Sequence, residues 1–200
     1  MASDHIKAAE GQLELAVREL KDKGPHYLEA FENALKIPDS GESKRVTHNI
    51  MVSLERDFNV VFPDYMGFAN FGRAAQKPMG EVEKCDMALK LLDMYGKELL
   101  RYAEYAKSGS VVEHSQVCTQ AGAYFERKGE LLERKAQLRE EEGRKKMARD
   151  IYADAAAAYN AAATWWGGSY EAGRLRKEQC EKKAADIVAT KVPPAGEKVR

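Results

Sequence analysis

The sequence predicts an all-α protein, an elongated bundle of long kinked helices with coiled-coil-like packing. Strand patterns are almost absent, because the one cluster of β-branched residues, 59–62, is short and ends at Pro63. From residue 80 onward, apolar side chains recur at intervals of three, four and seven, which is the spacing of an amphipathic helix. The 200-residue chain is 32% charged and 44% hydrophobic, a balance typical of chains that fold.

Residues 3–62 are predicted to form a broken first helical region. Gly24-Pro25 and the run 38–41 interrupt the helical spacing and divide the region into three helices. Ser43 is the expected N-cap of the third helix, because a serine hydroxyl accepts a hydrogen bond from the first turn. Residues 63–79 are expected to form a short helix or a packed loop.

A second helical region is predicted over 80–140, with a kink at Ser108-Gly109-Ser110, and a third over 147–190. Apolar residues of the third step by four and three, a heptad-like seam suited to helix-on-helix packing. The seam comprises Ala148, Tyr152, Ala155, Tyr159, Ala162 and Trp166. Gly167-Gly168 breaks it, and the last helix is expected to turn Leu175, Cys180, Ala184 and Ile187 inward. We therefore expect one all-α domain over 1–190 and a flexible tail at 191–200.

Residues 139–146 contain no apolar side chain, and two structures fit them. Three Glu–Arg or Glu–Lys pairs at i,i+4 support a helix that continues through Gly143. Each pair adds about 0.2–0.5 kcal/mol, while the glycine costs about 1 kcal/mol. The alternative is a solvated tip at which the chain reverses. The energies do not decide between them, but the loss of inward-facing apolar residues for two turns favours the tip.

Composition excludes several classes of protein. Lys+Arg and Asp+Glu are both 32, so the chain is not a strongly basic nucleic-acid binder. No apolar run approaches the roughly 20 residues that span a bilayer. The start of the chain has no apolar segment typical of a secretory signal, and the three widely spaced cysteines favour reduced thiols. We expect a cytoplasmic protein, and peripheral association with membranes is compatible with this.

The search for catalytic motifs is negative. The chain has no phosphate-binding loop, no dinucleotide fingerprint, no His-Glu-x-x-His and no Gly-x-Ser-x-Gly. His114 and Cys118 are four residues apart, but two ligands fall short of the three or four that zinc takes. We therefore predict that the protein is not an enzyme, has no catalytic residues, and uses neither a metal, a cofactor nor a small-molecule substrate.

Two features are candidates for binding. Residues 126–150 hold nine basic and seven acidic side chains, which form either a solvated helix face or a surface for anionic lipid or an acidic partner. Trp165 and Trp166 are adjacent on a helix, so their rings point about 100° apart and cannot share one seam. One ring is then a core residue and the other covers a helix end, or the pair is a partner anchor.

The stretch Leu99-Leu-Arg-Tyr102-Ala-Glu-Tyr105, followed by Val111-Val112 and by Leu131-Leu-Glu-Arg-Lys135-Ala-Gln-Leu138, resembles the second helix of sorting-nexin BAR (Bin/Amphiphysin/Rvs) domains. The predicted layout of three helical regions is also similar. The resemblance implies a homodimer that binds curved anionic membrane through basic side chains near the tip. The matching positions are Arg134, Lys135, Arg139, Arg144, Lys145 and Lys146.

The stretch Ala148-Arg-Asp-Ile-Tyr152-Ala-Asp-Ala155-Ala-Ala-Ala-Tyr159, with Trp165 and then Tyr170-Glu-Ala172-Gly173, resembles a helical hairpin of the soluble attachment proteins of vesicle fusion and of tetratricopeptide-like proteins. This resemblance implies an adaptor that binds other proteins. The sequence thus predicts a non-catalytic binding protein: a BAR-like dimer that acts in membrane trafficking or remodelling, or alternatively a helical adaptor. An unrelated helical bundle is the third option.

Overall fold

The computed structural model describes residues 2–19, 23–62, 79–106, 111–167 and 170–189, and these residues form seven helices and no strand. The predicted all-α class is confirmed. The predicted loop or short helix before residue 79, the kink at Ser108-Gly109-Ser110 and the C-terminal tail lie outside the described residues. Contacts divide the chain into two compact units, Met1–Gly109 and Ser110–Arg200.

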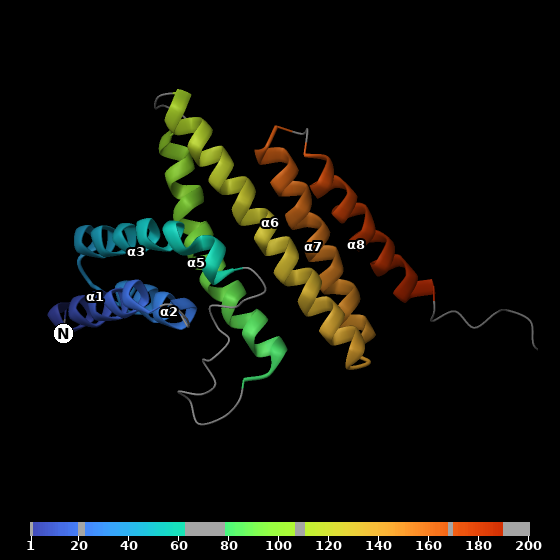
Figure 1. The fold of residues 1–200 in the computed structure, drawn as a ribbon, viewed down its shortest axis with the longest axis horizontal. Helices are drawn as coiled ribbons and strands as arrows, with labels where there is room; N and C mark the ends of the chain where they lie inside the picture. The colour runs from blue at the N-terminus through green and yellow to red at the C-terminus, as the bar shows by residue number, and fades with distance from the viewer. Residues whose placement is uncertain (1, 20–22, 63–78, 107–110, 168–169, 190–200) are drawn as a thin grey trace, which may run out of the picture. The chain divides into compact units, whose positions relative to one another are not determined.

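The described residues of the N-terminal unit form four helices: α1 (Ala2–Arg18), α2 (Lys23–Ala34), α3 (Ser40–Val61) and α5 (Glu81–Ala106). Helix α2 packs against α1, α3 and α5 (Figure 1). The core of the unit consists of large apolar side chains that are almost fully buried, among them Tyr27, Phe31, Ile50, Leu54, Leu91, Leu92 and Tyr95.

Two helix starts in this unit differ from the sequence prediction. Gly24-Pro25 lies inside the first turn of α2, where proline has no helical hydrogen bond to lose. The pair was predicted to end the first helix, but α1 already ends at Arg18. Asp39 caps α3, since its Oδ1 accepts a hydrogen bond from the Glu42 amide at 2.7 Å. The predicted cap, Ser43, instead lies in the first turn of α3 and donates to the carbonyl of Ala34 at 2.9 Å.

A buried lysine ties the first three helices together. Lys23 Nζ donates to the Ala16 carbonyl at 3.1 Å and to Asp57 Oδ2 at 2.8 Å, and the Tyr27 hydroxyl donates to the same carboxylate oxygen at 2.8 Å. Removing a charge from water is costly unless the charge is paired and hydrogen-bonded. All three contacts satisfy that condition, so this cluster fixes how α1, α2 and α3 meet.

The described residues of the C-terminal unit form three consecutive antiparallel helices: α6 (Val111–Glu141), α7 (Lys145–Trp165) and α8 (Glu171–Ala189). Helix α7 lies between α6 and α8, and α6 and α8 make little direct backbone contact (Figure 1). The predicted seam residues of α7 from Ala148 to Ala162 are buried. In α8 the buried residues are Gly173, Cys180 and Ile187, and Leu175 is exposed. The heptad spacing of the buried three explains why Leu175 points elsewhere.

The chain reverses between α6 and α7, as the missing apolar residues suggested. Gly143 has φ +75°, its amide donates to the Glu140 carbonyl at 2.8 Å, and the Arg144 amide donates to the Arg139 carbonyl at 2.8 Å. This pair of bonds is the Schellman arrangement, which needs a left-handed residue and therefore favours glycine. Gly167, with φ +77°, ends α7 in the same conformation.

Candidate functional site

The six predicted basic residues fall into three groups in the C-terminal unit. Two of them, Arg139 and Arg144, converge on the Glu142 carboxylate at 2.7 and 3.4 Å. The single carboxylate balances one of the two positive charges. The structure thus brings these two cations together at the reversal, but with an anion between them.

The other four basic residues do not form one cluster with them. Arg134 and Lys135, adjacent on α6, point about 100° apart and each has an interaction partner. Lys145 and Lys146 are exposed in the first turn of α7 and take part in no ion pair within the described part of the chain. Of the six predicted positions, these two keep the charge available to a ligand.

The two tryptophans lie at the C-terminal end of α7 and do not share a face. The Trp166 ring lies against Gly122 of α6, and it meets the Tyr170 ring edge-on with centroids 4.3 Å apart. Trp165, like Trp166, is half-buried. Trp166 therefore packs within the unit, and the partner-anchor role predicted for the pair stays a prediction.

A ladder of tyrosines and glutamates fixes the register of α6 against α7. The Tyr152 hydroxyl donates to Glu140 at 3.2 Å, and seven residues later the Tyr159 hydroxyl donates to Glu133 at 3.1 Å. The next heptad position of α7 is Trp166, which has no hydroxyl, and Tyr170 supplies the hydrogen bond to Glu126 instead. Small residues at the same spacing on α6, namely Gly122, Gly129 and Ala136, are buried in this interface.

Two cations of α8 complete the ladder. Arg176 bonds to Glu130 at 2.9 Å and lies over the Tyr159 ring, 5.6 Å from its centroid. Lys183 bonds to Glu133 at 2.9 Å and lies over the Tyr152 ring at 5.2 Å. Each cation thus reaches from α8 across a tyrosine of α7 to α6, and these contacts link the three helices into one layer.

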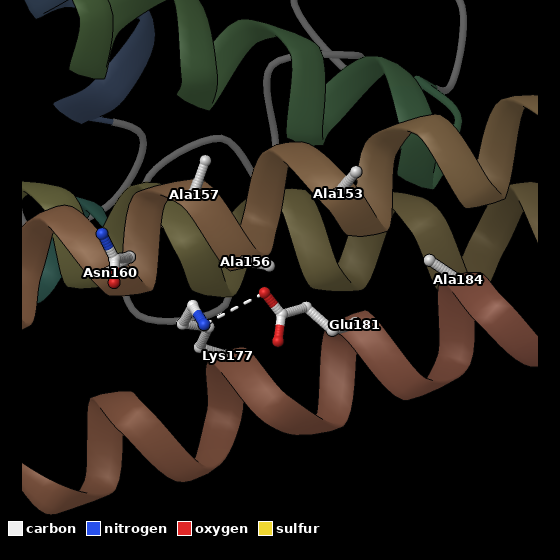
Figure 2. A pocket seen from close by; sticks show the side chains of 7 residues that line it. All are labelled: Ala153, Ala156, Ala157, Asn160, Lys177, Glu181 and Ala184. Atoms are coloured by element: carbon white, nitrogen blue, oxygen red, sulfur yellow. Dashed lines mark ion pairs between the residues drawn. The ribbon is translucent and has the colours of Figure 1, made fainter.

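A groove runs between α7 and α8 in this layer. Its volume is about 380 Å³, and it is lined by Ala153, Ala156, Ala157, Asn160, Lys177, Glu181 and Ala184. Figure 2 shows Lys177 and Glu181 of α8 near Ala156 of α7, joined to each other by an ion pair of 3.0 Å. Ala153, Ala157 and Asn160 are exposed. The groove is thus a shallow, mainly apolar depression, and the Lys177–Glu181 ion pair on its α8 wall carries no net charge.

Two cysteines of this unit lie in different surroundings. Burial, then the charge of Glu133, raises the pKa of the Cys180 thiol to about 11, which makes the thiolate scarce at neutral pH. Cys118 Sγ lies 3.7 Å from His114 Nε2. Within the described residues no three potential metal ligands gather at one point. Nor does any helix of that part of the chain have the length and apolar character needed to cross a membrane.

Sequence reasoning missed the groove residues. The run of alanines in 153–163 was visible, and its small side chains indicated close helix packing, but alanine is equally common in helix interiors. Lys177 and Glu181 are an i,i+4 pair, which by itself indicates only a solvated helix face. The sequence alone did not show which residues of α7 lie opposite which residues of α8.

Comparisons of this chain with protein-family models, with curated proteins and with solved structures found no match.

Proposed function

We propose that this protein is a non-catalytic helical adaptor that binds a partner protein through the face between α7 and α8. The observation that carries the proposal is the open layer formed by α6, α7 and α8. Because α8 packs beside α7 and not over both other helices, the layer leaves a groove exposed between two helices. Grooves between helices are a common seat for a helix of a partner.

The polar ladder supports this function because it makes the groove pre-formed. Tyr159 contacts Glu133 of α6 and Arg176 of α8, so α6, α7 and α8 cannot slide along one another without breaking these bonds. A surface that is already ordered loses little conformational entropy when it binds. A rigid scaffold with an exposed groove is what an adaptor needs.

Membrane association by a BAR-like dimer is the second candidate. One observation favours it: Lys145 and Lys146 are exposed at the tip, without an ion pair in the part of the chain that the structure describes. Each cation near an anionic surface contributes about 1 kcal/mol, so two contribute about 2 kcal/mol per chain. This supports weak attraction, and a dimer would double it. The adaptor is the stronger candidate because it uses the whole face and not only the tip.

Site-specific photo-cross-linking tests the adaptor function. A photoreactive phenylalanine replaces Ala157 in the groove of the full chain, and a matched control places it at Asp154, which is exposed but does not line the groove. We expect protein adducts at position 157 that are absent at 154, and the captured protein, once identified and purified, should bind the unmodified chain. Equal adduct patterns at both positions, or salt-sensitive pelleting with anionic liposomes in place of protein adducts, would contradict the adaptor function.

A further inference from the structure

Helix α8 carries charged residues on two sides, and the two sides differ in their ion pairs. On the side that meets α7 and the groove, each charged residue is paired within the C-terminal unit. These paired residues are Arg176, Lys177, Glu181 and Lys183. The charges of α8 that are free to meet another molecule therefore lie on its other side.

On the side turned away from α7, four exposed charged residues follow one another at intervals of four. They form what we call the outer row: Arg174, Glu178, Lys182 and Asp186. Helix α8 is the outer helix of its unit, so this side is not covered by α6 or α7 (Figure 1). Residues four apart are close enough to pair along a helix. In the described part of the chain, however, none of the four forms an ion pair or a side-chain hydrogen bond.

The outer row is complementary to itself when it is reversed, because its charges run plus, minus, plus, minus. In an antiparallel pair of α8 helices centred at the level of residue 180, Arg174 lies opposite Asp186 of the second copy. Glu178 lies opposite Lys182 of the second copy, and twofold symmetry repeats both contacts to give four ion pairs. A parallel pair, or a shift by one turn, would bring like charges together. The row therefore specifies both the direction and the register of the contact.

The surface of α8 suits this contact. Residues four apart form a ridge on a helix, and two such ridges run alongside each other when the helices cross at about 50°. From Arg174 to Asp186 the ridge is about 18 Å long at 1.5 Å per residue. Leu175, which is 49% exposed, and the exposed Ala185 flank the ridge on its two sides and add apolar surface. A contact between two single helices is smaller than the roughly 1,200 Å² of stable complexes, so we expect weak association.

We infer that two copies of the chain associate through the outer rows of their α8 helices, in antiparallel orientation. The outer row contains none of the residues that line the groove, so this surface is distinct from the proposed adaptor site. A dimer carries two grooves, and it would bind a partner with repeated sites more tightly than a single copy does. The inference does not rest on the adaptor function, because association is measured with the chain alone.

Sedimentation velocity of the full chain over a range of concentrations tests the inference. At low salt, the weight-average sedimentation coefficient should rise with concentration toward the value of a dimer. At about 1 M salt the Debye length is about 3 Å, and the rise should largely disappear because the exposed ion pairs are screened.

Charge reversal at the two central positions tests the register. Glu178→Lys or Lys182→Glu turns two of the four pairs into contacts between like charges, and each should weaken dimerisation about tenfold. A mixture of the two variants again has opposite charges at every contact, so it should sediment faster than either variant alone at the same total concentration. The double variant Glu178→Lys/Lys182→Glu should dimerise as the native chain does.

Glu29→Lys and Lys44→Glu are the matched controls. They make the same changes in net charge at exposed residues of the N-terminal unit that have no ion pair among the described residues. Both should sediment as the native chain does, and mixing them should have no effect. Circular dichroism confirms that each variant is helical.

Four results would overturn the inference. The first is a native chain that stays monomeric at low salt, which would leave the outer row to a different partner or to solvent. The second is a dimer that neither salt nor the single reversals weaken. The third is a mixture or a double variant that does not recover dimerisation, and the fourth is an equal loss in the two controls. Cross-linking at Ala157 is read separately, so none of these results decides the adaptor function.

Discussion

The ring of Tyr159 lies directly over Gly129. A β-carbon at residue 129 would come within 2.7 Å of Tyr159 Cε1, closer than two carbon atoms pack. The hydroxyl of the same tyrosine donates to Glu133 at 3.1 Å and accepts from Arg176 at 3.1 Å. Tyr159 therefore packs against α6 through its ring and binds both α6 and α8 through its hydroxyl, and the layer depends on it.

The close approach predicts an unusual response to a helix-favouring substitution. Gly129→Ala should lower the free energy of unfolding by about 1–3 kcal/mol, because the new methyl group pushes on a buried ring that cannot move away. Intrinsic helix propensity works in the opposite direction, by about 1 kcal/mol. Urea unfolding followed by tryptophan fluorescence measures this effect, since both tryptophans lie in the C-terminal unit.

Gly11 is the matched control for that substitution. It also lies within a helix, α1, but no atom lies within 4 Å of the position that its β-carbon would take. Gly11→Ala should therefore raise stability by about 0.5–1 kcal/mol in urea unfolding followed by circular dichroism. If Gly129→Ala is as stabilising as Gly11→Ala, the ring does not lie over Gly129 as described.

Truncating Tyr159 itself should disrupt the C-terminal unit. Tyr159→Ala removes a fully buried aromatic side chain, which costs about 3–5 kcal/mol, and limited proteolysis should then cleave within α7 and α8. Tyr159→Phe keeps the ring and loses only the hydroxyl contacts, at a cost of about 1 kcal/mol, and should stay resistant. Equal resistance of Tyr159→Ala and the native chain would show that the layer does not depend on this ring.

Alkaline pH should destabilise the C-terminal unit. Burial, followed by the hydrogen bond to Glu126, raises the pKa of Tyr170 to about 12, compared with about 10 for an unfolded tyrosine. Burial also raises the pKa of Tyr152 and Tyr159. Between pH 10 and about 12 the unfolded state therefore loses protons that the folded state retains. The stability from this source is fully present below pH 10 and falls as the pH rises through that window.

Urea midpoints measured at several pH values across this window test the effect. Tyr170→Phe has no proton to lose at this position, so its stability should fall less steeply with pH than that of the native chain. A native chain and a Tyr170→Phe variant with the same slope would contradict the assignment to Tyr170.

The cysteines should differ in reactivity. Cys180 is fully buried and its thiol pKa is raised to about 11, whereas Cys118 is only half-buried. A maleimide at neutral pH should therefore modify Cys118 well before Cys180. Peptide mass spectrometry over a time course identifies the order. Modification of Cys180 first, or at the same rate, would mean that the packing of α8 against α7 does not bury this thiol as described.

The sequence predicted the helices better than their ends or their partners. The heptad steps from Ala148 to Ala162 correctly identified the buried face of α7, because a helix period is a local property. The predicted cap of α3, Ser43, was wrong. Asp39 and Ser43 are both good capping residues, and the backbone conformation determines which of them caps the helix. Leu175 was predicted to point inward because it is apolar. In the structure Leu175 is exposed, and Gly173 holds the buried position against α7.

The candidate site was only partly accessible from the sequence. Lys145 and Lys146 were predicted to bind near a tip, and the chain does reverse beside them at Gly143. Their role as a binding site stays a prediction, and nothing local showed that Glu142 binds Arg139 and Arg144. The groove depends on which residues of α7 and α8 lie opposite each other. That relationship is set by long-range contacts such as Arg176 with Tyr159, and a single sequence does not encode it in any short motif.

Amide hydrogen exchange of the full chain, with and without the purified partner protein identified by cross-linking at position 157, tests the central claim most directly. Binding in the groove predicts slower exchange in α7 between residues 146 and 160 and in α8 between residues 174 and 188. Exchange in α1, α2 and α3 should be unchanged. Protection that appears in those N-terminal helices instead, or no change in α7 and α8 at a partner concentration that saturates binding, would contradict the claim that this face is the binding surface.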